Sequence, residues 1–247
     1  MTSVLLSLSG VLQSWGTTTI GHARATNGYP TKSAIVGMVA NALGRDREDD
    51  ISDISSVGFA VRVDMPGVVQ RDYHTVSILK QPTKGDRISR VTERFYLADA
   101  AFLVVLSHPD RVMMDDIARS LKSPSRALFL GRKSCSPTRP IFHSVSESEL
   151  SSVLSETEWL ADEKTQREYL DEFIELDVFR DPLTDIEGFE SDVISDEPVS
   201  FSSDARRYAS RGVYRSTVRI SLGAKTVPSQ SMTNPLQLAF EAAGGKA

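Results

Sequence analysis

The chain has 247 residues, 40% of them hydrophobic, and a formal net charge of -5 at pH 7. This length suffices for one sizeable core, so we expect a globular protein. The first residues lack a cationic stretch before a short apolar run, and no apolar run approaches the roughly 20 residues of a membrane span, which predicts neither export nor membrane insertion. A single cysteine excludes an internal disulfide, and the four histidines have no metal-ligand spacing. We therefore expect a reducing, cytoplasmic setting without metal or cofactor.

The N-terminal part of the chain predicts alternating strands and helices. Residues 4–9 form an apolar run typical of a strand, and residues 35–43 carry apolar side chains at i, i+3 and i+4, with Gly44 as the helix end. Residues 59–65 alternate between apolar and polar side chains. A Pro-Gly pair follows, which predicts a hairpin between this strand and residues 68–76.

Residues 77–94 are too polar for a core and long for a hairpin link, so they predict a projecting basic finger or a solvated loop. Residues 100–107 predict a buried strand, and Asp110 can begin the next helix. This order indicates an α+β fold class. We expect a ferredoxin-like, RNA-recognition-type domain with helices on one face of an antiparallel sheet.

Charge is strongly segregated along the chain. Residues 147–204 contain 19 acidic and three basic residues, whereas the remainder contains 14 acidic and 25 basic residues. We expect residues 1–146 to form the main basic domain and residues 147–247 to form an acidic C-terminal lobe with a closing basic strand. The acidic segment is interpreted as a solvated lobe, as a shield against wrong polyanions, or as a protein-binding face.

Two basic clusters have backbone contexts suited to phosphate. Lys32 and Ser33 fall at a predicted helix start, where free amides and the helix dipole favour an anion, although ordinary capping explains them equally well. Arg132, Lys133 and Ser134 follow Gly131, which would let backbone amides approach a ligand closely. No acid occurs anywhere from residue 117 to 146.

Two further clusters are the basic finger at 77–94 and a C-terminal set of arginines between 206 and 219. Arg215 and Arg219 share one face of a predicted strand, and because no acid lies between 205 and 240, facing salt bridges are disfavoured as their explanation. Together the four clusters predict a phosphate track on one cradle for a single-stranded RNA end. Nearby aromatic residues would stack on bases or lie in the core: Trp15, Tyr29, Tyr73 and Tyr208.

A basic RNA-binding surface with histidines is also compatible with a metal-independent ribonuclease. His74 and His22 are the histidines near cations, and general acid-base cleavage would need one of them close to the attacked hydroxyl. Asp72 and Thr75 can equally hold His74 in a structural role. The sequence shows no nucleophile elbow, P-loop or dinucleotide fingerprint, so it supports no conventional nucleophile.

Several motifs resemble, in order, those of the CasD family of Cascade subunits from type I-E CRISPR systems. They are LQSWG at 12–16, Arg24 with Thr26, YPTKS at 29–33, RDYHTV at 71–76, FLGRKSC at 129–135, DEP at 196–198 and RRYASR at 206–211. The resemblance covers most of the chain, apart from the acidic stretch and the tail from residue 224.

The resemblance implies a RAMP-type ferredoxin-like domain with an extended thumb hairpin, at about 77–94, and a smaller C-terminal lobe. It implies a non-catalytic subunit that caps the backbone filament and holds the five-prime handle of the guide RNA (crRNA). The implied partners are crRNA, a CasC-like backbone subunit and a CasA-like large subunit, with target DNA met only through the complex and no membrane contact.

The RNA-binding residues that follow from the clusters and the resemblance are Arg24, Lys32, Ser33, Arg71, Tyr73, His74, Arg87, Arg90, Arg94, Arg132, Lys133, Ser134 and Arg211. Two alternatives remain. One is an endoribonuclease that processes CRISPR repeat RNA through His74. The other is a scaffold whose basic patches bind acidic proteins instead of RNA.

Overall fold

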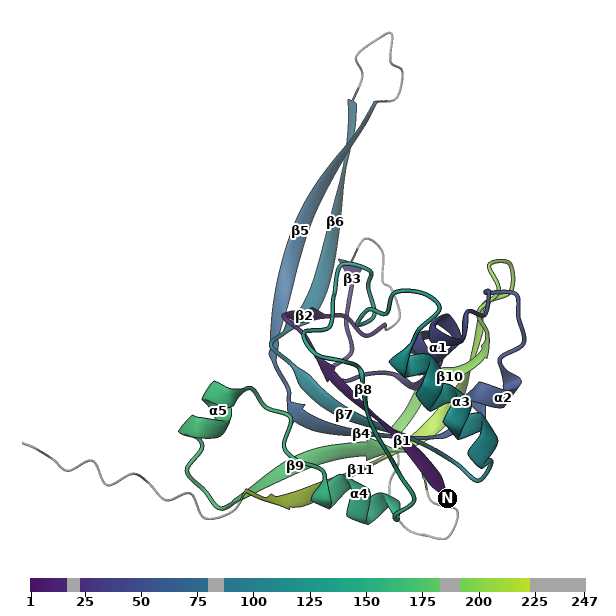
Figure 1. Ribbon diagram of the computed structural model, residues 1–247. Helices are drawn as coiled ribbons and strands as arrows, with labels where there is room; N and C mark the ends of the chain where they lie inside the picture. The colour runs from purple at the N-terminus through teal and green to yellow at the C-terminus, as the bar shows by residue number, and fades with distance from the viewer. Residues whose placement is uncertain (17–22, 80–86, 183–191, 223–247) are drawn as a thin grey trace, which may run out of the picture.

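A seven-stranded antiparallel sheet forms the centre of the computed structural model, a mixed α/β fold (Figure 1). The structure describes residues 1–16, 23–79, 87–182 and 192–222. Within these ranges the strand order is β10-β11-β9-β4-β7-β1-β8, and all neighbours are antiparallel. The strands are β1 (Thr2–Ser9), β4 (Gly58–Met65), β7 (Ala101–His108), β8 (Phe142–Ser146), β9 (Phe173–Arg180), β10 (Asp192–Ser200) and β11 (Arg207–Ser221).

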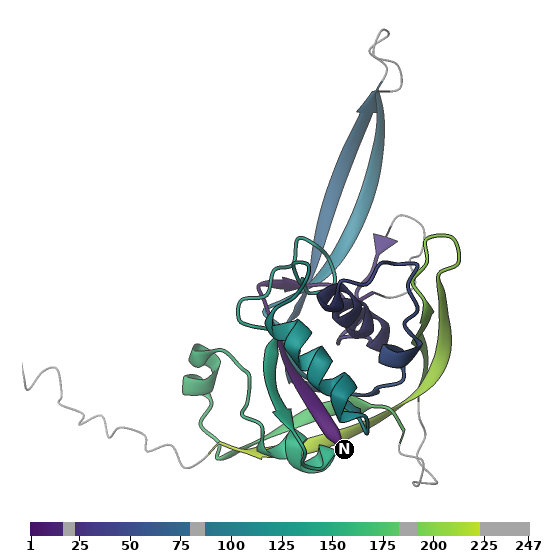
Figure 2. The same cartoon turned by 45° about the vertical axis from the view of Figure 1, so that its right-hand side comes forward.

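Two helices, α1 (Lys32–Leu43) and α3 (Arg111–Lys122), cover one face of this sheet and enclose the main hydrophobic core (Figure 2). β1 directs Leu6 and Leu8 into that core, whereas Leu5 belongs to a second cluster on the opposite face. β7 buries side chains on both faces. Its nearly continuous apolar sequence is explained by this double burial.

The local signals for these helices are confirmed. α1 ends where Gly44 adopts a left-handed conformation with φ of 81°. The side chain of Asp110 caps α3 by accepting a hydrogen bond from the amide of Met113 at 3.1 Å. A short helix, α2 (Ser52–Ser55), follows α1. Among the described residues, no helix is long and apolar enough to cross a membrane.

A long hairpin of β5 (Val68–Leu79) and β6 (Arg87–Ala98) projects away from the sheet (Figure 1). The predicted hairpin between residues 59–65 and 68–76 is therefore wrong, because β4 pairs with β7 and β9 while β5 pairs with β6 along its whole length. Of the basic finger predicted at 77–94, residues 77–79 and 87–94 belong to this longer hairpin, and residues 80–86 lie outside the described part of the chain. Polar side chains occupy both faces of β5, so the strand has no apolar face to bury against the core.

Two short strands pair with β6 at the base of the long hairpin and complete a second, four-stranded sheet with it. β2 (Leu12–Gln13) runs antiparallel and β3 (Ala23–Arg24) runs parallel beside β6. The buried Gln13 side chain donates to the carbonyl oxygen of Ala100 at 2.7 Å, just before β7 begins. The hairpin is thus fixed at its root and extends freely beyond it.

The described strands after residue 146 belong to the same sheet as the N-terminal strands. β9, β10 and β11 extend the N-terminal sheet, so strands from both sides of the predicted boundary at residue 146 are continuous. Two short helices, α4 (Leu150–Glu156) and α5 (Glu163–Glu168), precede β9. α4 covers the second face of the sheet through Val153 and Leu154, which pack against Leu103.

A fully buried arginine joins the sheet to α4. Nε and Nη2 of Arg62 each donate to a carboxylate oxygen of Asp64 at 2.7 Å. Nη1 donates to the carbonyls of Leu154 and Thr157 at 2.6 and 2.8 Å, and Nη2 also reaches the carbonyl of Glu158 at 2.7 Å. This guanidinium therefore binds the carbonyl groups at the end of α4, which no helical amide satisfies.

We expect Arg62→Ala to lower the free energy of unfolding by about 3–5 kcal/mol, because it leaves the carboxylate of Asp64 buried without its partner. The exposed Arg215–Asp177 pair provides the control, and Arg215→Ala should leave the free energy of unfolding nearly unchanged. Urea denaturation followed by tryptophan fluorescence measures both variants. Equal losses in the two would contradict a structural role specific to Arg62.

Candidate nucleic-acid interface

Three of the predicted RNA-binding arginines meet at the root of the long hairpin, and we call them the root cluster: Arg24, Arg94 and Arg132. Arg24 of β3 lies opposite Arg94 of β6 in the parallel register. Nη2 of Arg132 donates to the carbonyl oxygen of Arg24 at 3.0 Å, across 108 residues of sequence. Its guanidinium carbon lies 4.5 Å from the ring centre of Tyr96, a cation–π contact.

The loop that carries Arg132 is held against the chain by a glycine. Gly131 has φ of 85°, and a Cβ atom there would lie 1.7 Å from the carbonyl oxygen of Ser14. The amide of Gly131 donates to the carbonyl of Phe129 at 3.0 Å. This glycine permits close packing within the chain, whereas the approach of the amides of Arg132, Lys133 and Ser134 to a ligand stays a prediction. The side chains of Lys133 and Ser134 remain exposed beside it.

The described side chains of the long hairpin offer a mixed surface. Arg71 forms an ion pair with Glu93, and Nδ1 of His74 lies 2.7 Å from a carboxylate oxygen of Asp72. Tyr73 is 58% exposed and carries no such pairing. The predicted contacts at Arg87 and Arg90 lie in β6, but their side chains fall outside the described part of the chain, as do Lys80 and Lys84.

The aromatic residues considered for base stacking separate into a pair of which one ring is buried and the other partly buried, and an exposed pair. Trp15 is fully buried in the main core, and Tyr29 stacks on Phe179 with ring centres 4.0 Å apart. Tyr73 and Tyr208 are the exposed pair, and Tyr208 is 43% exposed. Only the second pair presents a ring face to a base.

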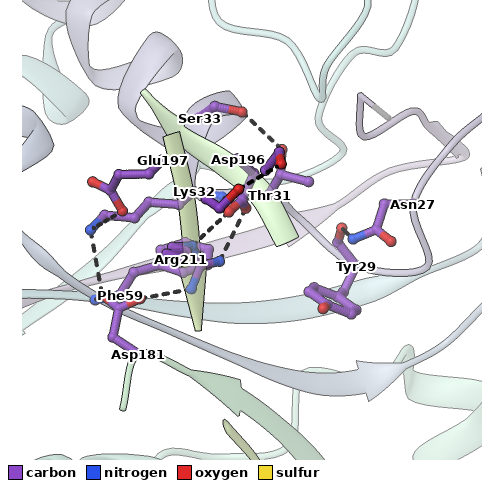
Figure 3. Close-up of polar contacts among 12 residues, drawn as sticks. Asn27, Tyr29, Thr31, Lys32, Ser33, Phe59, Asp181, Asp196, Glu197 and Arg211 are labelled. Carbon is purple, nitrogen blue, oxygen red and sulfur yellow. Dashed lines mark hydrogen bonds and ion pairs between the residues drawn. The ribbon is translucent and has the colours of Figure 1, made fainter. Parts of the chain in front are cut away.

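Lys32 and Arg211 are buried in an ionic cluster rather than presented to a ligand, and we call it the carboxylate cluster (Figure 3). Nζ of Lys32 lies 2.9 Å from Glu197 and 3.4 Å from Asp181. Arg211 donates to Asp196 at 2.6 and 3.0 Å and to Asp181 at 2.7 Å. The prediction that these two cations bind RNA phosphates is therefore wrong, because carboxylates of the acidic segment already neutralise them.

A carboxylate also occupies the start of α1. The amide of Lys32 donates to Oδ2 of Asp196 at 2.8 Å, which is the place that the sequence pattern assigned to a phosphate. The half-buried Ser33 lies next to it, its hydroxyl 3.4 Å from that of Thr31. Burial opposes the charge of Arg211, but the hydrogen bond to Asp196 and the neighbouring carboxylates outweigh burial and raise its pKa.

The C-terminal arginines are only partly available. Arg215 pairs with Asp177 of β9 at 3.0 Å, and Arg219 stacks over the ring of Phe173 at 4.1 Å. The facing salt bridge that the local sequence disfavoured is thus present. The expectation of one cradle built from all four clusters is wrong in this respect, since the cations divide between the root cluster, the carboxylate cluster and the outer face of β11.

Sequence reasoning missed the acidic side of the carboxylate cluster, for which the DEP motif at 196–198 was the available signal. Asp181, Asp196 and Glu197 come from a segment that was interpreted as a solvated lobe or a face for other molecules. Tyr96 was also missed as the partner of Arg132. Among the described residues, no group of three or more histidine, cysteine, aspartate or glutamate side chains is placed to hold a metal ion.

The chain has counterparts in a known family. The family model "CRISPR-associated protein (Cas_Cas5)" matches residues 3–214. This match spans most of the chain, so the chain belongs to the Cas5 family of CRISPR-associated proteins.

Within that family the chain is similar to CasD, as its motifs had indicated. It is 33% identical to the Escherichia coli K12 "CRISPR system Cascade subunit CasD" over 157 residues, which cover 56% of this chain and 69% of the relative. A solved "CRISPR RNA-guided surveillance complex" contains a chain that is 28% identical, with TM-score 0.68 and coverage of 97% of this chain and 99% of that one. A solved "Cas protein" is 31% identical, with TM-score 0.65 and coverage of 92% and 100%.

We expect Gly131→Ala to displace the loop that carries Arg132, because the new methyl group would meet a backbone carbonyl and the positive φ would be strained by about 1–3 kcal/mol. Gly28→Ala is the control, since no atom lies within 4 Å of a Cβ built there. Thermal unfolding should show a clear loss for the first variant and little change for the second. A stable Gly131→Ala protein would contradict the close packing against Ser14.

Proposed function

We propose that this chain is a crRNA-binding subunit of a type I-E Cascade complex, which holds the five-prime handle of the guide RNA and caps one end of the backbone filament. Membership of the Cas5 family and similarity to a Cascade subunit support this function. The observation that carries it is the root cluster, where three arginines from distant segments gather beside exposed Lys133.

The root cluster supplies what a single-stranded RNA end requires. Arginine side chains bind phosphate oxygens through several N–H groups in a fixed plane, and Lys133 adds an exposed charge next to them. Ser134 offers a hydroxyl at the same place. The exposed ring of Tyr73 and the His74 imidazole extend the surface along the hairpin, where bases can stack on aromatic rings. Lys32 and Arg211 do not belong to this surface, because they are paired with carboxylates inside the fold.

The finer architecture and the partners belong to the same proposal. We regard the fold as a ferredoxin-like RAMP domain at 1–146, with the long hairpin as its thumb and a C-terminal lobe at 147–247. In this arrangement the thumb meets a CasC-like backbone subunit, a CasA-like large subunit lies nearby, and target DNA is met only through the complex, in the cytoplasm. The continuous sheet across residue 146 is compatible with two functional regions on one scaffold.

We expect Arg132→Gln and Lys133→Gln each to weaken binding of handle RNA and to flatten its salt dependence, by about 0.7 in slope for each phosphate that the variant no longer neutralises. Lys164→Gln is the control, because this exposed lysine of α5 lies in the acidic region. Fluorescence anisotropy with labelled RNA across a salt series measures both quantities. Unchanged affinity and slope in the first two variants would overturn the assignment.

We also propose that the chain does not cleave RNA. His74 is held by Asp72, and neither a second histidine nor a lysine contacts that pair within the described part of the chain. Repeat RNA incubated with the purified protein in EDTA should therefore stay intact on a denaturing gel. Cleavage that disappears in His74→Ala would establish the endoribonuclease instead.

A further inference from the structure

A second cationic site lies beside α1, as a pocket of about 500 Å³. This volume falls within the range of about 300–1,000 Å³ that is usual for small-ligand sites. Figure 2 shows its two sides, the loop that follows α1 and the turn between β10 and β11, next to each other. Four arginines and three aromatic residues line it: Arg45, Arg47, Arg126, Arg206, Phe129, Phe201 and Tyr208.

The floor of the pocket is the outer face of α1, which carries small side chains. Ser33, Ala34, Gly37 and Ala40 line it, together with Met38 and Asn41. A Cβ atom at Gly37 would lie 3.6 Å from its nearest neighbour, the ring of Phe201, which is ordinary contact distance. The ring of Phe201 therefore packs over Gly37, and the space for a ligand lies beside this contact, toward Tyr208 and the arginines.

The arginines of the pocket differ in their pairing. Arg45 and Arg126 each form an ion pair with a neighbouring aspartate, and Arg126 also donates to the carbonyl oxygen of Arg45 at 2.6 Å. These contacts fix one wall. Within the described ranges, Arg47 and Arg206 have no carboxylate partner within ion-pair distance, so they leave the pocket with an excess of positive charge that an anion can neutralise.

The opposite wall is aromatic and is held in place before any ligand arrives. Tyr208 lies edge-on to Phe201, with ring centres 6.5 Å apart. Glu48 of the loop after α1 accepts hydrogen bonds from the amide and hydroxyl of Ser203, at 3.1 and 3.2 Å. Since Ser203 lies in the turn between β10 and β11, this bridge joins the two walls. An exposed ring beside unpaired arginines suits a nucleobase and its phosphate.

We propose that this pocket binds one unstacked nucleotide of single-stranded RNA, with its base against Tyr208 and its phosphate at Arg47 and Arg206. The inference rests on the proposed function, because it takes the ligand to be the same RNA that the root cluster binds. Gly131 lines the pocket and precedes Arg132 directly. A strand bound at the root cluster therefore needs only to pass over this one loop to reach the pocket.

The test fills the pocket without changing its charge. Gly37→Leu places a branched side chain on the floor, whereas Gly37→Ala fits at ordinary contact distance and serves as its control. Tyr208→Ala removes the stacking ring, and Tyr208→Phe keeps it. We expect Gly37→Leu and Tyr208→Ala to weaken binding of the full-length protein to a short single-stranded RNA by about tenfold, with both controls close to wild type.

A spectroscopic readout locates the nucleotide. The same RNA is made with 2-aminopurine at one position at a time, and stacking in the pocket should alter its fluorescence at a single position in the wild type but not in Tyr208→Ala. If Gly37→Leu and Tyr208→Ala bind normally while Arg132→Gln binds weakly, the pocket inference is overturned and the proposed function stands. If the wild-type protein binds no RNA, both the pocket inference and the proposed function are wrong. Circular dichroism confirms that each variant is folded.

Discussion

The carboxylate of Asp196 is the contact on which the arrangement of this molecule depends. It accepts from the first amide of α1 and from the guanidinium of Arg211, so one side chain of β10 joins the helix layer to β11. Asp181 adds a third attachment by accepting from the amide of Phe59 in β4 at 3.0 Å. Buried ions are costly unless they are paired and hydrogen-bonded, and here each has several partners. The turn between β10 and β11 is consequently held over α1, where it forms a wall of the pocket.

This cluster changes the meaning of the charge segregation along the chain. The acidic segment is not simply a solvated surface, because it supplies carboxylates that neutralise Lys32 and Arg211 inside the fold and Arg215 on its face. Among the described residues, the cations that these carboxylates do not reach include Lys133 and Arg24 at the root cluster and Arg47 and Arg206 at the pocket. A negative total charge is therefore compatible with a local anion-binding surface, since charges at a distance are screened by salt.

How much of the structure could be predicted depends on how far apart the interacting residues lie along the sequence. β1, β7, α1 and α3 were predicted because burial, periodicity and caps such as Asp110 are local signals. The pairing of β5 with β6 was missed because none of the described side chains of β5 is buried, so no buried face of that strand sets a register. The role of Lys32 was wrong because its carboxylate partners lie about 150 residues away. The three arginines of the root cluster were predicted individually as RNA-binding residues, but their arrangement in space was not predicted. The pocket was missed because its walls come from four separate segments of the chain.

The Gly131 loop sets the path of any strand that uses both cationic sites. Gly131 packs against Ser14 and cannot move outward without breaking that contact, while Arg132 is fixed on Tyr96 and Arg24. A strand that binds the root cluster on one side of this loop and the pocket on the other cannot stay straight, because rigid chain stands between the two. The bend comes from the protein's shape, so it needs no particular base sequence at the turning point. Under the two binding proposals above, an RNA end that uses both sites must therefore bend at this loop.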